Sequence, residues 1–197
     1  MYIKEEASNT IVIEKSKFIA YLTPCFSEQE YKNYLKFLKK KHYDASHVCS
    51  GFIHNNIKRS SDDGEPSGTA GIPILSTLEK RKINHTAAFV VRYFGGIKLG
   101  AGGLIRAYGQ AISEALNVSK LVEDVTYKKY EIVLPYELAN KINNILEKEA
   151  INLQKEYGEE VKYLFLTNDD SLLSKIQELT SGFMPSFVGE EQIQKDV

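Results

Sequence analysis

The sequence lacks a long hydrophobic run, and this absence excludes proteins that cross the bilayer as helices. No window approaches the roughly 20 uninterrupted apolar residues that such a helix needs. Residues 1–9 carry Lys4, Glu5 and Glu6 and lack the apolar stretch of a signal peptide. We therefore expect a cytoplasmic protein with no membrane partner.

Cysteine is also scarce, because Cys25 and Cys49 are the two thiols and no CxxC pair is present. Two thiols allow at most one disulfide, and a chain without a secretory signal more often keeps its thiols reduced. We expect both to be small core residues. The missing CxxC pair argues against a structural zinc site, and no metal or cofactor is assigned.

The formal net charge of −1 conceals two oppositely charged halves. Residues 1–120 hold 17 basic and 11 acidic side chains, whereas residues 121–197 hold 8 and 15. A basic half within a neutral chain indicates an anionic partner such as phosphate or nucleic acid. The alternative is that the halves are two solvated surfaces that dock on each other.

Length and periodicity divide the chain at the same place. A chain of 197 residues allows two small domains, and no glycine lies between Gly109 and Gly158. The second half predicts the order strand, helix, strand, strand, helix, strand, which is typical of ferredoxin-like βαββαβ domains. We therefore predict an α+β protein of two domains, an α/β layer over residues 1–120 and a ferredoxin-like domain over residues 121–197.

The expected elements of each half follow from turn residues and hydrophobic spacing. In the first half we expect paired extended runs at 11–16 and 18–22, a helix from Ser27 to the basic run 39–41, a strand at 45–53, a polar loop to Gly68, a helix at 69–82, a buried strand at 86–94, a helix at 102–117 and a connection at 117–124. In the second half we expect strands at 125–136, 151–157, 161–167 and 186–193, a helix around 138–146, and a helix between Asp169 and Gly182. Ser27 and Glu30 form a capping box. Lysines at a helix end complement its dipole, and a nucleic-acid contact is the alternative.

The most informative stretch runs from Arg92 to Arg106 and contains the glycines Gly95, Gly96, Gly100, Gly102 and Gly103. It lies between a predicted strand and a helix N-terminus, where free backbone N–H groups and the helix dipole attract an anion. Lys98 can add a mobile charge, and Arg92 or Arg106 a planar fork. Neither the Walker A nor the G-x-G-x-x-G pattern is present. The alternative is a tight turn packed under the helix.

A second polar stretch, residues 60–73, holds three carboxylates, Asp62, Asp63 and Glu65. They could ligate Mg²⁺, satisfy the backbone of a turn, or form the wall of a pocket. Upstream, His47 and Cys49 alternate on one strand face. A Cys–His dyad, a buried pair, and a site lined by His47 alone all remain open.

Several segments together resemble the IMPACT/YigZ family. The matching residues are Ala45 to His47, Asp62 to Gly71, Arg92 to Gly100 and Gly103 to Tyr108. The resemblance covers residues 16–120, and the second half is similar to the small domain of the bacterial YigZ branch. It implies an N-terminal fold like the second domain of a small-subunit ribosomal protein, shared with translation factors and GHMP-type kinases. It also implies a C-terminal domain like one in elongation factor G.

The resemblance implies pocket candidates but no established reaction. By matching position these are His47, Asp63, Glu65, Arg92, Tyr93, Lys98 and Arg106. Eukaryotic relatives regulate translation through an additional N-terminal domain, which we expect to be absent here. Two hypotheses result: a binding module for RNA or the ribosome that uses the cationic glycine-rich loop, and an enzyme for a small phosphate-bearing molecule or nucleotide that uses the carboxylate loop and His47. No catalytic residue is assigned, and we favour the binding module.

Overall fold

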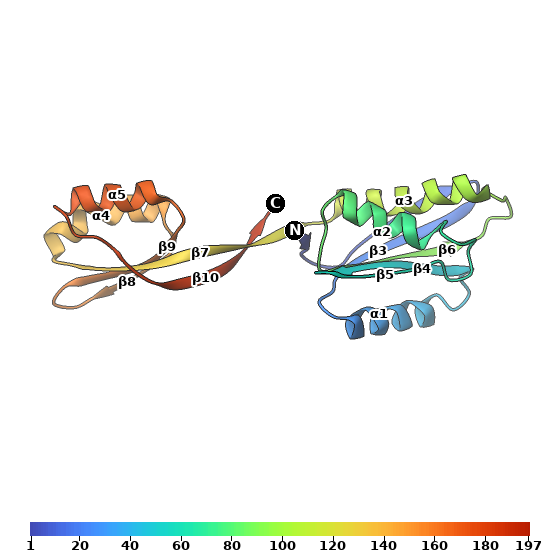
Figure 1. Ribbon diagram of the computed structural model, residues 1–197, viewed down its shortest axis with the longest axis horizontal. Helices are drawn as coiled ribbons and strands as arrows, with labels where there is room; N and C mark the ends of the chain where they lie inside the picture. Colours follow the sequence, from blue (N-terminus) through green and yellow to red (C-terminus); the bar gives the residue numbers. More distant parts are fainter. The chain divides into compact units, whose positions relative to one another are not determined.

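The computed structural model describes all 197 residues, and the chain forms two compact units (Figure 1). Unit 1 is Met1–Glu123 with Asp196–Val197, and unit 2 is Asp124–Lys195. Each unit has its own sheet, and the hydrophobic core of unit 2 is separate from the two cores of unit 1. None of the five helices combines the length and the apolar character that crossing a bilayer would need.

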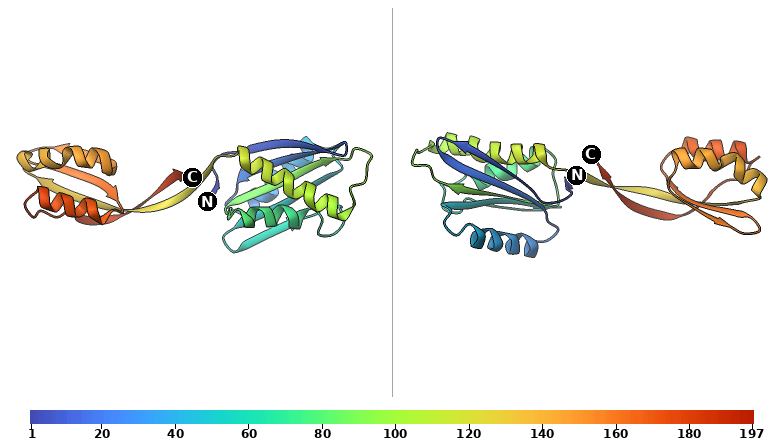
Figure 2. Two further views of the ribbon diagram at one scale, coloured as in Figure 1. Left: turned by 90° about the horizontal axis from the view of Figure 1, so that it is seen from above. Right: turned by 180° about the vertical axis from the view of Figure 1, so that it is seen from behind.

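Unit 1 is a sheet covered on both faces by helices. Its elements are β1 (Tyr2–Ile3), β2 (Ala7–Ile13), β3 (Ser16–Pro24), α1 (Glu28–Lys41), β4 (His47–His54), β5 (Ile57–Ser61), α2 (Gly71–Lys80), β6 (Thr86–Tyr93) and α3 (Gly100–Val118). The main sheet has the order β2-β3-β6-β4-β5, and every neighbouring pair is antiparallel. Helix α1 covers one face and α2 and α3 cover the other (Figure 1), side by side (Figure 2).

The central strand β6 explains why two cores form in this unit. All of its residues from Thr86 to Arg92 are buried, which confirms the expectation of a strand covered on both faces. Ala88 and Val90 pack with α2 and α3, whereas Phe89 and Val91 pack with α1. Alternate side chains of a strand point to opposite faces, so one apolar strand supplies both cores.

Unit 2 contains the elements predicted for the second half, in the predicted order. They are β7 (Leu121–Leu134, whose first residues belong to unit 1), α4 (Tyr136–Glu149), β8 (Ile151–Tyr157), β9 (Val161–Thr167), α5 (Asp170–Leu179) and β10 (Ser186–Asp196). The strands lie in the order β10-β7-β9-β8. Tyr130, Ile132 and Leu134 alternate along β7 and pack in one core with residues of α4 and α5.

The helix ends show how local sequence sets these boundaries. Ser27 Oγ accepts from the Glu30 N–H at 3.2 Å, and the Glu30 carboxylate accepts from the N–H of Phe26 at 2.8 Å. The capping box is confirmed, with the reciprocal bond made one residue upstream of the cap. Asp169 caps α5 by accepting from the Ser171 N–H at 2.8 Å. Gly182, with φ +106°, follows the end of α5 and donates to the Gln177 carbonyl.

Two expectations from the sequence are wrong. Residues 57–61, expected within a polar loop, form the edge strand β5, four of whose five residues are exposed, so they carry no apolar alternation that would predict a strand. The connection expected at 117–124 is mostly regular structure, because α3 runs to Val118 and β7 begins at Leu121. Val122 is fully buried there and pairs with Tyr2 of β1.

The glycine-rich loop is fixed to the fold at its first glycine. Gly95 lies against the backbone at Lys15 and Ser16, in the turn between β2 and β3, so closely that a Cβ at position 95 would overlap the Lys15 carbonyl group. Its N–H donates to Ser16 Oγ at 3.2 Å. Only glycine allows this approach of two backbone segments.

We therefore expect Gly95→Ala to lower the free energy of unfolding by about 1–3 kcal/mol, because two backbone segments must separate. The matched control is Gly102→Ala, where the nearest atom to a new Cβ is the flexible end of Arg106 at 3.6 Å. That change should leave the free energy of unfolding equal to wild type or raise it by up to about 1 kcal/mol, because Gly102 lies in α3 and alanine favours a helix. Urea unfolding of both variants measures the difference, and equal stabilities would contradict the close approach.

Candidate functional site

A cavity of about 400 Å³ lies in unit 1, at the end of the sheet where β6 leads into the glycine-rich loop. Its polar lining comes from three segments far apart in the sequence: His47 at the start of β4, Glu65 in the carboxylate loop, and Arg92 with Lys98 around the end of β6. Phe94, Leu99 and Leu104 form much of its apolar wall. The polar groups converge only through the fold, as is typical of ligand pockets.

A buried ion pair between Glu65 and Arg92 lines this cavity. Arg92 Nη1 donates to Glu65 Oε1 at 2.6 Å, and the two side chains are 5% and 4% exposed. The Tyr108 hydroxyl donates to the same carboxylate oxygen at 2.7 Å, and Ser16 Oγ accepts from Arg92 Nη2 at 3.4 Å. Burial of the paired charges is tolerated because the carboxylate has two donors. The charge of Arg92 is therefore already balanced within the protein.

His47 is oriented by the backbone of the carboxylate loop. Its Nδ1 lies 2.8 Å from the Asp63 carbonyl oxygen. A carbonyl only accepts hydrogen bonds, so Nδ1 is the donor. Nε2 lies 3.8 Å from Glu65 Oε2. The loop backbone therefore orients the imidazole with its Nε2 near the Glu65 carboxylate.

The three carboxylates of the loop have separate partners. Asp62 accepts from the N–H groups of Gly68, Ala70 and Gly71 at 2.8, 3.0 and 2.8 Å and so caps the start of α2. Burial raises its pKa, but these three bonds outweigh burial and leave the pKa below its ordinary value. Asp63 accepts from the N–H of Val48 at 2.7 Å and from Lys39 at 2.5 Å. Asp62 is a turn residue, while Glu65 is the carboxylate of the pocket wall.

The backbone N–H groups at the start of the glycine-rich loop have hydrogen-bond partners, whereas the helix that begins at its end has no side-chain cap. The N–H groups of Phe94 and Gly95 donate to the hydroxyls of Ser46 and Ser16. Helix α3 then begins at Gly100, which has φ +68°, and no side chain caps it. The first N–H groups of a helix have no partner within the helix, so this end is able to accept an anion.

Two of the three cations around the loop are open to solvent. Lys98 and Arg106 are exposed, and neither has a carboxylate within ion-pairing distance. Arg106, with Gly103 and Lys98, lines a neighbouring hollow of about 450 Å³ that reaches Glu14 in the β2–β3 turn. Lys98 therefore lies between this hollow and the pocket that contains His47.

The structure thus brings together some of the predicted site residues and separates others. His47, Glu65, Arg92, Lys98 and Gly100 line one cavity. Tyr93 does not, because its hydroxyl faces α1, where it contacts His42 Nδ1 at 2.9 Å and donates to Asp44 at 3.3 Å. The remaining predicted residues, Asp63, Gly95, Gly96, Gly102, Gly103 and Arg106, lie around the cavity without lining it.

Sequence reasoning missed how Tyr108 takes part in the site. The helical spacing places Tyr108 in the buried stripe of α3, and it is fully buried. Spacing shows which face a side chain occupies but not what its hydroxyl contacts. That hydroxyl joins Glu65 to Cys49, whose Sγ lies 3.3 Å from it. Cys49 is itself fully buried and shares a strand face with His47, as the alternation predicted.

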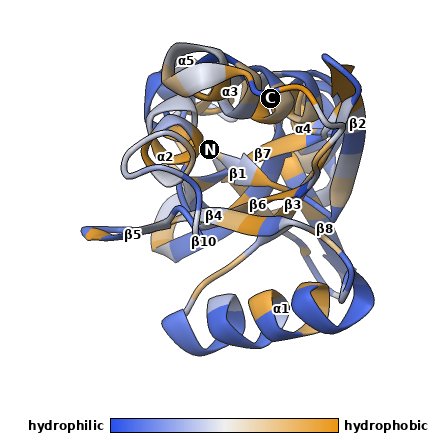
Figure 3. Ribbon diagram, turned by 90° about the vertical axis from the view of Figure 1, so that its right-hand side faces the viewer, coloured by the Kyte–Doolittle hydropathy of each residue, from blue (hydrophilic) through white to orange (hydrophobic).

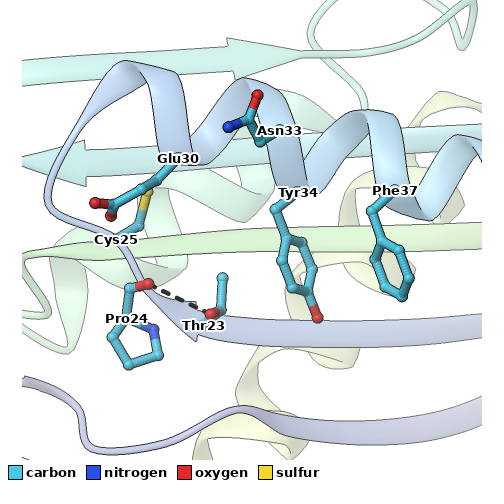
Figure 4. A pocket seen from close by; sticks show the side chains of 7 residues that line it. All are labelled: Thr23, Pro24, Cys25, Glu30, Asn33, Tyr34 and Phe37. Carbon is cyan, nitrogen blue, oxygen red and sulfur yellow. Dashed lines mark hydrogen bonds between the residues drawn. The ribbon is translucent and has the colours of Figure 1, made fainter.

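A different cavity, of about 440 Å³, lies between the end of β3 and α1. Figure 4 shows the rings of Tyr34 and Phe37 extending from α1, where they line the cavity, with Cys25 and Glu30 near the start of the helix. The Glu30 carboxylate is occupied by its capping bond. No cation lines this cavity, so it does not share the chemistry of the glycine-rich loop.

The environment of Cys49 predicts an unreactive thiol. Burial raises its pKa to about 12, and only a thiolate reacts rapidly with alkylating reagents. In the Cys25→Ser variant, which leaves one thiol, we expect no labelling by iodoacetamide at about pH 8 in the native state and rapid labelling in denaturant. Mass spectrometry at timed intervals measures both rates. Equal labelling rates in the native and denatured states would contradict the burial of Cys49 and would favour a reactive Cys–His dyad.

Known proteins resemble this chain over most of its length. The Impact N-terminal domain family matches residues 14–116. The IMPACT family member YvyE of Bacillus subtilis is 42% identical over 91% of this chain and 86% of its own length. The IMPACT family member YigZ of Escherichia coli is 34% identical over 68% of each chain. A crystal structure described as a hypothetical protein covers 98% of this chain and 95% of its own, with a TM-score of 0.61 and 26% identity. The chain is a member of the IMPACT/YigZ family.

Proposed function

We propose that this protein is a translation-associated binding protein that holds RNA, free or within the ribosome, through its cationic glycine-rich loop. The observation that carries the proposal is the pair of exposed, unpaired cations, Lys98 and Arg106, beside the uncapped start of α3. Arg92 has a different part in it, because its charge is balanced by Glu65. Arg92 donates to Glu65 and Ser16 beneath the glycine-rich loop, so phosphate binding is left to Lys98 and Arg106.

The charge distribution supports an extended anionic partner. Residues 1–120, all of which belong to unit 1, carry 17 basic against 11 acidic side chains. A surface with an excess of one sign raises the local concentration of oppositely charged ligands and speeds their association. RNA fits this requirement because it presents a phosphate at every nucleotide. Membership of the IMPACT/YigZ family supports the link to translation.

The fold names implied by the resemblance belong to the same proposal. We infer that residues 1–120 are related to the second domain of a small-subunit ribosomal protein and that residues 121–197 are ferredoxin-like. The element order of unit 2 and its strand order β10-β7-β9-β8 support the second inference. Folds of these kinds host many functions, so the proposed RNA binding depends on the residues of the site and not on the fold.

We expect the Lys98→Gln/Arg106→Gln variant to bind single-stranded RNA more weakly at every sequence. Removing two phosphate contacts should also lower the slope of log affinity against log salt by about 1.4. Fluorescence anisotropy over a salt series measures both quantities. The matched control is Lys80→Gln/Lys82→Gln, which removes the same charge before β6 begins, at the opposite end of that strand. Tight binding that ignores salt and the first variant would refute the proposal.

The pocket itself favours a second candidate, an enzyme or binding protein for a small phosphate-bearing molecule. The specific observation is that His47, Glu65 and Lys98 line one cavity together with an apolar wall. Lys98 and the start of α3 would hold the phosphate, while His47 Nε2 would accept or release a proton.

Thermal unfolding tests this candidate with nucleotides and sugar phosphates, each with and without Mg²⁺. A ligand at 100 times its dissociation constant should add about 2.7 kcal/mol to the free energy of unfolding. Lys98→Gln should abolish the stabilisation, whereas Lys80→Gln should leave it intact. No stabilisation by any member of the panel would count against a small phosphate-bearing ligand.

A further inference from the structure

The end of the sheet that carries the glycine-rich loop is also cationic on the α1 side. Helix α1 ends at Lys41, and the next residue, His42, contacts the hydroxyl of Tyr93 at the end of β6. Lys17 of β3 lies opposite Tyr93 of β6 in the antiparallel pairing of these two strands. The C-terminus of α1 and the start of the glycine-rich loop therefore meet at one end of unit 1.

On the α1 side of this end lie exposed lysines that have no carboxylate within ion-pairing distance. They include Lys17, Lys40 and Lys41, whereas their neighbour Lys39 pairs with Asp63. The effect of these charges is visible at His42, whose pKa is lowered by burial, by Lys41 and by Lys17, against an opposing effect of Asp44. Two lysines and one carboxylate thus act on His42 at this end of unit 1.

An almost fully exposed tyrosine accompanies these lysines. Tyr43, in the turn after α1, is 86% exposed, so it buries little apolar area and adds little to folding stability. Figure 3 shows α1 as mostly hydrophilic, with few hydrophobic turns. Phe37 of α1 is 51% exposed, and Lys41 Nζ lies 5.6 Å from its ring centroid. Exposed rings among lysines provide faces for bases and charges for phosphates.

We propose that this surface, made of Lys17, Lys40, Lys41 and Tyr43, binds a single-stranded segment of RNA. The inference rests on the proposed RNA binding and extends it from the glycine-rich loop to the α1 side. A base stacks on Tyr43, and the backbone phosphates lie on the lysines. A duplex would not fit this chemistry, because its bases are already stacked and paired and offer Tyr43 no free face. An acidic peptide would satisfy the lysines but not the exposed ring.

Tyr43 provides the sharpest test. Tyr43→Ala should raise the dissociation constant for a single-stranded RNA of about 12 nucleotides by about tenfold, the effect of losing one stacked base. Tyr43→Phe keeps the ring and should bind like wild type. The matched control is Tyr157→Ala, which removes a tyrosine of β8 that is 66% exposed. A duplex of the same length should bind Tyr43→Ala and wild type equally.

The lysines are tested through the salt dependence of binding. Lys40→Gln/Lys41→Gln should lower the slope of log affinity against log salt by about 1.4, the change expected for two phosphate contacts to a single strand. Lys80→Gln/Lys82→Gln is again the control with equal charge. Polyglutamate, used as a competitor at equal charge concentration, should displace the RNA poorly.

The outcomes separate this inference from the proposed function. If wild type binds no RNA, both are overturned. If binding depends on Lys98 and Arg106 but Tyr43→Ala and Lys40→Gln/Lys41→Gln bind like wild type, only the α1 surface is overturned. Preference for the duplex, or displacement by polyglutamate as effective as by RNA, would also overturn it. Tenfold weakening by Tyr43→Ala with recovery in Tyr43→Phe supports it.

Discussion

The buried ion pair between Glu65 and Arg92 holds the candidate site together. It joins the carboxylate loop to the central strand, across 27 positions of sequence, and its partners Tyr108 and Ser16 extend the connection to α3 and β3. Separating such a pair leaves an uncompensated buried charge, at a cost of about 3–5 kcal/mol. The carboxylate loop is therefore fixed against β6, and His47, held by the carbonyl of Asp63, is fixed with it.

This pairing separates the cations around the glycine-rich loop into one buried and two exposed side chains. A buried arginine must be balanced inside the protein, and Glu65 balances Arg92. Lys98 and Arg106 lie in water, where an unpaired charge costs little and stays available to a ligand. The glycine-rich loop is anchored where Gly95 meets Lys15, and its end, where α3 begins, has no side-chain cap. The same stretch of sequence thus supplies a rigid base and a cationic rim.

Local chemistry made much of the fold predictable, whereas the site depended on contacts that local chemistry does not determine. The cap at Ser27, the cap at Asp169 and the uniform burial of β6 all follow from neighbouring residues. Strand β5 was missed because an exposed edge strand carries no apolar alternation. Arg92 and Tyr93 are adjacent on one strand, so only one of them can face the pocket, but choosing between them requires knowing where α1 and α3 lie. The partner of Glu65 could not be predicted for the same reason.

The two candidate functions share one requirement and differ in another. Both need a phosphate near Lys98 and the start of α3, because the other charges of the cavity, Glu65 and Arg92, already balance each other. They differ in what enters the cavity of about 400 Å³. A small ligand would have to fill it to gain apolar contacts with Phe94 and Leu104, whereas an RNA strand could follow the rim without entering. His42, just after α1, contacts Tyr93 at the end of β6, so a ligand that reached both the glycine-rich loop and α1 would have to be extended.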